Sequence, residues 1–182
     1  MTDHPSEAIK LPSPRTDSGV SVEKAIERRR SVREFSDAPI SLADLSQLLW
    51  AAEGMTGRGE LRASPSAGAT YPLEICVVTA RVTGLSNGIF KYRPQKHELV
   101  RMREGNVLLD FARGSVGQSC VEEAGAVIVL SAVYERTTGV YGQRGIRYVD
   151  NEIGHTAENV WLQAMPSLNP IWTPGVPSSE TP

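Results

Sequence analysis

Cysteine is scarce in this sequence, and long hydrophobic runs are absent. Cys76 and Cys120 are its two cysteines, and they form neither a CxxC pair nor a disulfide framework. No apolar run approaches the roughly 18 residues that a membrane-spanning helix needs. The first residues, Met1–Pro5, lack the basic and apolar regions of a secretory signal. We therefore expect free thiols and a location in the reducing cytoplasm.

An excess of charge of either sign is also missing. The 19 basic and 21 acidic residues leave a net charge of −2, which argues against a generally basic nucleic-acid binder but allows a local basic cluster. Hydrophobic residues make up 40% of the 182 residues, which is ordinary for a folded protein. The length suits one domain with a substantial core.

Proline is concentrated at the two ends and divides the chain into three regions. Residues 1–20 hold three prolines and no apolar periodicity, so we expect an extended arm. Residues 21–165 carry the regular patterning and are expected to form the domain. Residues 166–182 hold five of the twelve prolines, which predicts an irregular tail that is neither helix nor central strand.

Two helices are predicted before the first strand. Ser21 suits the N-cap of a helix that ends near Arg30 and places Val22, Ala25 and Ile26 at helical spacing. Ser41, with Asp44 three residues later, predicts a second capped helix. That helix has an apolar stripe of leucines and alanines and ends at Gly54.

The rest of the domain alternates between strands and helices. Strands are predicted at residues 73–78, 89–92, 98–102 and 126–133, helices at 107–113 and 149–164, and a loop at 55–70. The first three strands suggest an antiparallel meander, with Asn87-Gly88 as a hairpin turn. The apolar run 126–133 is interpreted as a central strand. This order predicts an α+β domain with a mainly antiparallel sheet flanked by helices.

The densest positive cluster is Arg28–Arg33, at the end of the first predicted helix. Its ordinary interpretation is a solvated basic helix end, which complements the negative end of the helix dipole. Its functional interpretation is an anion site, because guanidinium groups bind phosphate oxygens through paired hydrogen bonds.

A second candidate is the small-residue segment Pro65–Pro72. Small side chains let backbone N–H groups approach a planar or anionic ligand closely. The segment could also be a flexible surface loop. Its position directly before a buried-looking strand favours a binding loop, because binding elements are often loops mounted on rigid strands.

Together these segments resemble one known family. The similarity also includes Pro39–Leu42, Leu48–Ala52, Tyr71–Glu74, Tyr141–Gly145 and Gly154–Asn159, and it covers roughly residues 8–165. The sequence resembles the nitroreductase-like flavoenzymes, specifically their SagB/ThcOx-type dehydrogenase branch. Any one of these motifs alone is weak, but the set is specific.

The resemblance implies an obligate homodimer that binds FMN in the subunit interface and transfers a hydride to or from a small organic substrate, with NAD(P)H as a transient co-substrate. One subunit would hold the phosphate and ribityl chain through Arg29, Arg30, Ser31 and Arg33. The other would contact the flavin through Pro65, Ser66, Ala67 and Gly68, with Gln118 as a further polar contact.

The sequence departs from this family at two places. Azole-forming members have a Lys-Tyr pair where this chain has Val140-Tyr141, and valine cannot act as an acid or base. Tyr141 remains the catalytic candidate, and azoline oxidation is disfavoured. After Ala164 the family's usual Leu-Gly-Leu-Gly turn and closing strand are replaced by the Pro-rich tail, which we interpret as a truncated or frame-shifted end.

Three alternatives remain open at this point. The chain could be a flavin-poor, non-catalytic remnant or accessory subunit of the same family. It could be an anion- or RNA-binding module, although no run of stacking aromatics accompanies the arginines. Glu152, His155 and Glu158 could share a helix face as metal ligands, but one Glu-x-x-His motif is too little for a di-iron site, so we expect no metal.

Overall fold

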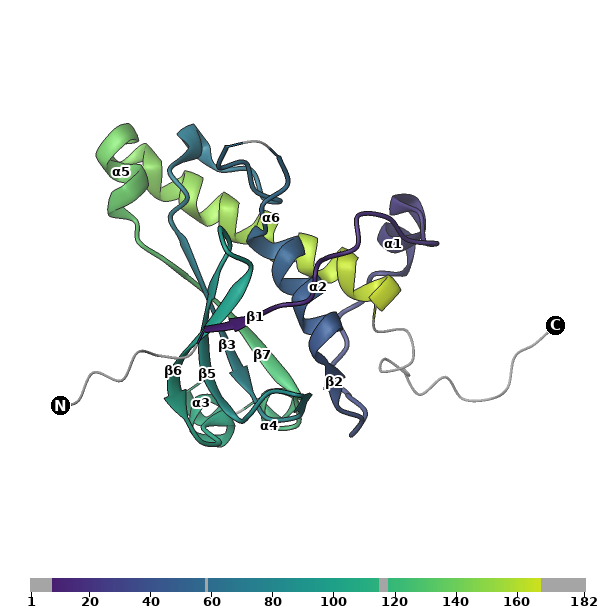
Figure 1. Ribbon diagram of the computed structural model, residues 1–182. Helices are drawn as coiled ribbons and strands as arrows, with labels where there is room; N and C mark the ends of the chain where they lie inside the picture. The colour runs from purple at the N-terminus through teal and green to yellow at the C-terminus, as the bar shows by residue number, and fades with distance from the viewer. Residues whose placement is uncertain (1–7, 58, 115–117, 168–182) are drawn as a thin grey trace.

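Five antiparallel strands form the main sheet, in the order β1-β6-β5-β3-β7 (Figure 1). The computed structural model describes residues 8–57, 59–114 and 118–167. The strands are β1 (Ala8–Lys10), β3 (Leu73–Thr79), β5 (Gly88–Arg93), β6 (Glu98–Glu104) and β7 (Ala126–Ala132). A small parallel pair joins β2 (Ile40–Ser41) to β4 (Val82–Thr83). The predicted α+β fold with an antiparallel sheet is confirmed.

Helices cover both faces of the sheet. They are α1 (Val22–Arg28), α2 (Leu42–Glu53), the 3-10 turn η1 (Ala67–Ala69), α3 (Leu108–Gly114), α4 (Ser119–Glu122), α5 (Glu135–Tyr141) and α6 (Arg144–Ser167). The long α6 packs along α2, and Figure 1 shows α1 beside its C-terminal part and α5 at its start.

Helix α2 forms as its sequence predicts. The Ser41 Oγ accepts a hydrogen bond from the Asp44 N–H at 3.0 Å and so caps the helix. Leu45 and Leu49 are buried against the sheet strands, where they pack with Ile75, Val77 and Phe90. Gly54 ends the helix, as expected.

Strand β7 lies at an edge of the sheet, so its prediction as a central strand is wrong. Among the described residues it pairs only with β3, from Leu73↔Ala132 to Thr79↔Ala126. Its sequence is apolar on both sides because both faces are covered. Ile128 and Leu130 pack with the core under α2, and Val127 and Val129 pack with the cluster that contains α3.

Two local predictions also need correction. Gly88 is the first residue of β5 rather than part of a tight hairpin turn, because β4 lies between β3 and β5. A Cβ at Gly88 would meet the carbonyl oxygen of Arg103 at 2.4 Å, so glycine is required there by close packing. Helix α1 ends at Arg28 and buries only Ala25, while Val22 and Ile26 are exposed.

The ends of the described chain join the domain more closely than predicted. Residues Ala8–Lys10 of the expected arm pair with β6, and Leu11 is buried in the core. A hydrogen-bonded group ties the arm down: the Ser46 hydroxyl donates to the Pro12 carbonyl at 2.6 Å, and a His97 ring nitrogen lies 3.0 Å from the same oxygen. Helix α6 extends to Ser167, and residues 168–182 of the expected tail lie outside the described residues.

Candidate functional site

The Pro65–Tyr71 segment, here called the loop, has an unusual backbone. Gly68, Ala69 and Tyr71 have φ angles of 60°, 51° and 44°. For residues other than glycine, this left-handed region costs about 1–2 kcal/mol, because Cβ crowds the backbone. Such conformations persist where surrounding contacts fix them, and they concentrate at functional sites.

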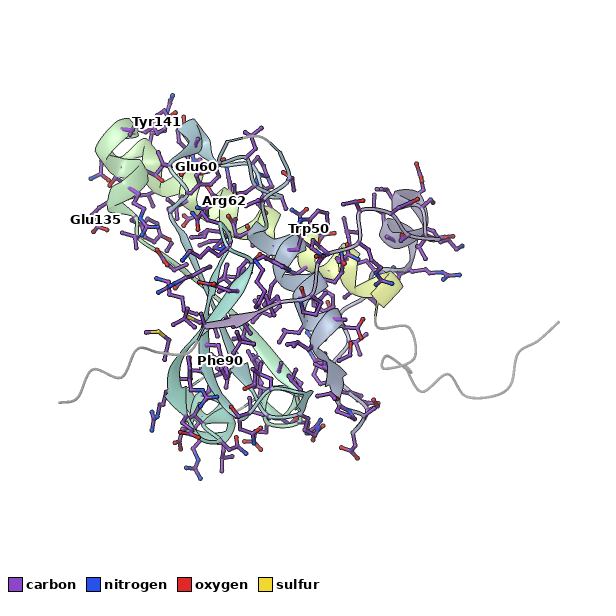
Figure 2. All side chains as sticks on the ribbon, viewed as in Figure 1. Trp50, Glu60, Arg62, Phe90, Glu135 and Tyr141 are labelled. Carbon is purple, nitrogen blue, oxygen red and sulfur yellow. The ribbon has the colours of Figure 1, made fainter. Side chains whose placement is uncertain are left out.

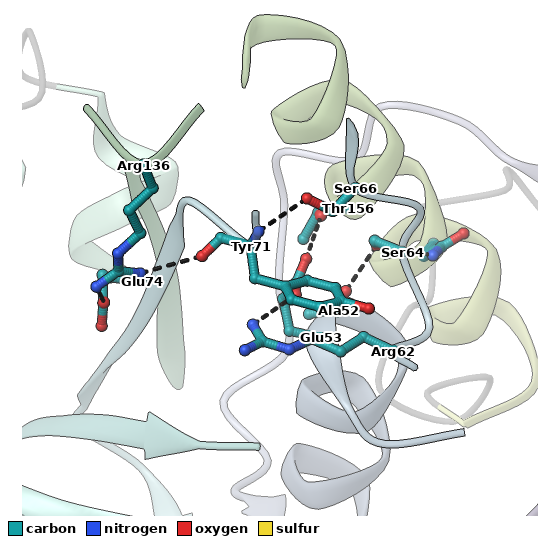
Figure 3. Close-up of polar contacts among 10 residues, drawn as sticks. Ala52, Glu53, Arg62, Ser64, Ser66, Tyr71, Glu74, Arg136 and Thr156 are labelled. Carbon is teal, nitrogen blue, oxygen red and sulfur yellow. Dashed lines mark hydrogen bonds and ion pairs between the residues drawn. The ribbon is translucent and has the colours of Figure 1, made fainter. Parts of the chain in front are cut away.

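Hydrogen bonds from within the loop and from α5 hold this backbone. The Tyr71 N–H donates to the Ser66 Oγ at 2.9 Å, and Arg136 Nη1 donates to the Tyr71 carbonyl oxygen at 3.0 Å (Figure 3). The hydroxyls of Thr70 and Thr137 lie 2.8 Å apart, and Thr137 is fully buried. The loop is therefore held by its own Ser66 and by the first turn of α5.

A buried ion pair lies beneath the loop. Arg62 Nη1 donates to Glu53 Oε2 at 3.2 Å, and the Thr156 hydroxyl donates to Glu53 Oε1 at 3.0 Å (Figure 3). The Arg62 guanidinium also stacks 4.1 Å from the centre of the Tyr71 ring. Burial raises the pKa of Glu53, while the contacts with Arg62 and Thr156 oppose that rise.

Glu152 is a second buried carboxyl at the same place. It is 2% exposed, and neither of its oxygens has a hydrogen-bond partner among the described residues. Burial raises the pKa of Glu152 to about 7, the Ser66 hydroxyl and Arg62 lower it, and the charge of Glu53 raises it further. The Ser66 hydroxyl is thus close enough to lower the pKa of Glu152, although the two side chains do not form a hydrogen bond in the structure.

The structure brings Tyr141 to the loop. A Cβ built on Gly68 would lie 2.6 Å from the Tyr141 hydroxyl oxygen, so the two residues are in direct proximity. Tyr141 is 38% exposed and packs edge-to-face on Tyr148, with ring centres 5.1 Å apart. Val140 is exposed beside it. Figure 2 shows Tyr141, Glu60 and Arg62 in the same region of the molecule.

The arginine segment Arg28–Arg33 begins at the last residue of α1 and continues beyond the end of that helix. Arg30 Nη1 donates to the carbonyl oxygens of Glu27 and Arg29 at 3.0 and 2.7 Å. The side chains of Arg28, Arg29 and Arg33 make no ion pair or hydrogen bond with other described residues, and Ser31 is exposed. The segment therefore presents several guanidinium donors that the described part of the chain leaves available.

The loop and the arginine segment do not meet within one chain. Ser66 lies beside Glu152, whereas α1, whose last residue begins the arginine segment, packs on the later part of α6, where both helices line a cavity of about 260 Å³ near Asn159 and Leu162 (Figure 1). Ten residues separate Glu152 from Leu162, about 15 Å along a helix axis. A single copy of the chain thus presents the two predicted halves of the site at different positions.

Gln118 lies apart from the loop, whereas Glu152, the first residue of the Glu152, His155 and Glu158 motif, lies beside it. Gln118 is exposed at the start of α4, beyond the far end of β3 and β7, and its Oε1 accepts from the Cys120 thiol at 3.7 Å (Figure 1). Glu152 is buried while His155 and Glu158 are exposed. The three side chains therefore do not share one environment, although their spacing suggested a common helix face. Within the described ranges, no group of three His, Cys, Asp or Glu residues is arranged to hold a metal ion.

A polar cleft of about 480 Å³ adjoins the loop on the sheet side. Glu74 lies in it and forms ion pairs with both Lys91 and Arg136. Burial would raise the pKa of Glu74, but the hydrogen bonds and charges of Lys91 and Arg136 outweigh burial and lower it. Arg136 thus connects this cleft to the Tyr71 carbonyl oxygen.

Sequence reasoning missed four polar residues around the loop, Glu53, Arg62, Arg136 and Thr137, and it considered Glu152 only as a metal ligand. One signal was available, because Glu53 ends an otherwise apolar helical stripe. The others depend on contacts with distant parts of the chain, such as Thr70 with Thr137, that no local pattern reveals.

The sequence profile of the Nitroreductase family matches residues 26–168. The chain belongs to this family. It is also 44% identical over 145 residues to a protein named as a nitroreductase from Methanocaldococcus jannaschii, and this similarity covers 80% of the chain and 73% of its relative. An oxidoreductase of the nitroreductase type is therefore supported.

Solved structures confirm the nitroreductase-like fold. A structure titled as a nitroreductase from Ralstonia eutropha has a TM-score of 0.75 and 28% identity, over 90% of this chain and 74% of that one. One from Anabaena variabilis also has a TM-score of 0.75, with 24% identity over 88% of this chain. This chain spans 34% of that protein. The Escherichia coli microcin synthetase McbBCD complex shares the fold at TM-score 0.62 and 21% identity, over 82% of this chain and 61% of that one.

Membrane insertion through a helix finds no support. In the part of the chain that the structure describes, no helix combines the length and hydropathy needed to cross a bilayer.

Proposed function

We propose that this protein is an FMN-dependent oxidoreductase that exchanges a hydride between the flavin and a small organic substrate. Membership of the nitroreductase family supports the reaction class. The observation that carries the cofactor assignment is the arginine segment, whose Arg28, Arg29 and Arg33 side chains have no partner among the described residues. Guanidinium groups left free in this way suit a phosphate, which accepts several charge-assisted hydrogen bonds.

The residues present fit an FMN at both of its ends. Arg29 and Arg33 offer donors for the phosphate, with Ser31 exposed beside them. At the ring end, Gly68 has a left-handed backbone, and the Tyr141 hydroxyl oxygen lies too close to it for a side chain with a Cβ. A rigid loop of small residues lets a planar ring approach the backbone closely.

The flavin, when bound, supplies the hydride chemistry. The chain would contribute binding and orientation: Arg29 and Arg33 neutralise the phosphate, and the loop fixes the position of the ring. The Tyr141 hydroxyl oxygen, next to Gly68, is the group that we propose to hold a proton near the substrate. Its neighbour Val140 cannot assist, which disfavours azoline oxidation even though we propose a place in the SagB/ThcOx-type branch.

We propose that the two halves of the site come from two copies of the chain. The loop lies beside Glu152 of α6, and α1, which leads into the arginine segment, lies beside Asn159 and Leu162. One flavin would therefore contact the loop of one subunit and the arginines of its partner. A homodimer of this kind would take NAD(P)H as a transient electron donor on the exposed face of the ring.

Flavin binding to the purified protein tests the proposal. We expect a yellow protein, or uptake of added FMN followed by fluorescence quenching, together with a dimeric mass in solution. The substitutions Arg29→Ala and Arg33→Ala should each weaken FMN binding about tenfold or more, since a charge-assisted hydrogen bond contributes roughly 1.5–3 kcal/mol. The matched control is Arg103→Ala, which removes another exposed arginine from β6 and should leave the affinity unchanged.

The alternative is a non-catalytic family member that folds but does not bind flavin. Val140 in place of a basic residue is the observation that favours it. A colourless protein that takes up no FMN would establish this alternative and refute the enzyme. Bound FMN that dithionite reduces and a generic acceptor reoxidises would refute the alternative.

A further inference from the structure

Glu152 is the one buried carboxyl near the loop that has no cation of its own among the described residues. It lies on α6, is 2% exposed, and neither oxygen has a hydrogen-bond partner in the described ranges. An unsatisfied buried polar group is rare in native proteins and calls for a physical explanation.

The charges around Glu152 favour its neutral form. Glu53 faces it from α2, and Arg62 and Ser66 face it from the segment that precedes β3. Among the described residues, Arg62 is the single cation that acts on both carboxyls, and it is already bonded to Glu53, which also accepts from Thr156. If both carboxyls were ionised, one negative charge would be buried without compensation, which is strongly unfavourable. Burial accordingly raises the pKa of Glu152 to about 7.

Two contacts, here called anchors, hold Tyr71 in place, and ionisation of Glu152 would disturb both of them. The first anchor is the Ser66 Oγ, which accepts the Tyr71 N–H and lies next to Glu152. The second is the Arg62 guanidinium, which covers the Tyr71 ring at 4.1 Å and would be drawn between two carboxylates. Because Tyr71 has a left-handed backbone, weaker anchors favour its relaxation and a change in loop shape.

We propose that Glu152 is a positioning residue whose neutral carboxyl holds the loop in its FMN-binding shape, so that ionisation of this one side chain weakens the affinity for FMN. The inference rests on the proposed function and adds a regulation by pH to the same site. Glu152 acts through Ser66 and Arg62 and does not itself touch the flavin.

The first test is the FMN dissociation constant between pH 5.5 and 8.5, measured by fluorescence quenching. For the unmodified protein we expect the affinity for FMN to fall as pH rises. The total fall should be about tenfold for each pKa unit by which the pKa of Glu152 is higher with FMN bound than without it. Glu152→Gln keeps a neutral side chain, so its affinity should stay high across this range. Glu158→Gln, an exposed change on the same helix, should follow the unmodified protein.

The second test needs no flavin. The folded protein holds the Glu152 proton more tightly than the unfolded chain, so the free energy of unfolding should decrease as pH rises from about 4.5 through 7. Glu152→Gln should remove this part of the pH dependence. If that variant does not fold, Ser66→Ala serves instead: it deletes a hydroxyl that lowers the pKa of Glu152, so the midpoint should move to higher pH.

Each outcome is decisive. Equal pH dependence of FMN binding in the unmodified protein and in Glu152→Gln overturns the inference and leaves the proposed function intact. An unfolding profile that neither Glu152→Gln nor Ser66→Ala changes also overturns it. The absence of FMN binding at every pH overturns both the inference and the proposed function.

Discussion

The loop and the arginine segment differ in where their polar groups find partners. In the loop, Ser66, Thr70 and Tyr71 all bond to other residues of the chain. In the arginine segment, Arg28 and Arg33 extend from an exposed backbone without a partner among the described residues. The comparison indicates that contacts within the fold fix the shape of the loop, whereas the described residues supply no such contacts to Arg28 and Arg33, which we propose to bind an external phosphate.

The two regions should also differ in how much their charged side chains contribute to the free energy of unfolding. The Glu53–Arg62 pair beneath the loop is almost wholly buried, with side chains 1% and 9% exposed. Removing one partner of such a pair leaves a desolvated charge, whereas surface charges remain solvated when a neighbour is lost. We therefore expect substitutions around the loop to affect folding and substitutions in the arginine segment to affect binding.

The largest effect is expected from Arg62→Ala. It leaves Glu53 and Glu152 buried without a cation and removes the stacking on Tyr71, so the free energy of unfolding should fall by about 3–5 kcal/mol. Urea denaturation would measure it. The control is Arg93→Ala, which breaks an exposed pair with Glu98 and should cost less than about 1 kcal/mol. Equal losses in the two variants would show that the buried Glu53–Arg62 pair contributes no more to stability than a pair at the surface.

A smaller effect is expected from Gly68→Ala. The new Cβ would lie 2.6 Å from the Tyr141 hydroxyl oxygen. The alanine would also have to adopt the φ of 60° that Gly68 has. We expect a loss of about 1–2 kcal/mol from the left-handed conformation alone. Thermal unfolding would measure this loss of stability. In the double variant with Tyr141→Ala, the part of the loss caused by the clash with the Tyr141 hydroxyl should be recovered.

Gly139→Ala is the matched control for that change. Gly139 lies in α5, and a Cβ there meets nothing within 4 Å. Alanine should therefore stabilise the protein by up to about 1 kcal/mol through helix propensity. A similar loss at both glycines would show that the loop backbone is not specially constrained.

The smallest effect on stability is expected from Arg28→Ala and Arg33→Ala. Neither side chain has a partner among the described residues, so unfolding should change by less than about 0.5 kcal/mol. Titration with inorganic phosphate should nevertheless show weaker binding in both variants. A marked loss of stability would mean that the segment has a structural role, as the loop does.

The sequence predicted the elements that local patterns determine. Helix α2 has a side-chain cap, a leucine stripe and a terminating glycine, and all three were readable. Helix α5 was missed because Thr137, Thr138 and Gly139 are poor helix formers, and the buried contact of Thr137 with Thr70 supports it instead. The edge position of β7 could not be read from its composition, since coverage of both faces gives the same apolar run in either position.

For the candidate site, the sequence named the small residues of the loop but not the polar residues that lie around them. Gly68 and Tyr141 were both named from the family resemblance, and the structure places them side by side. The burial of Glu53 depends on Thr156, which lies 103 residues later in the chain. No spacing rule anticipates such a partner, so the carboxyl pair beneath the loop became visible only in three dimensions.

Strand β1 has a practical consequence for producing this protein. Ala8–Lys10 occupies the outer edge of β6, and Ser46 and His97 hold the chain that follows at Pro12. Shortening the N-terminus past Leu11 would expose a row of backbone donors and acceptors next to Leu99 and Val100. Such an edge can recruit strands from other molecules, so trimmed preparations should tend to aggregate.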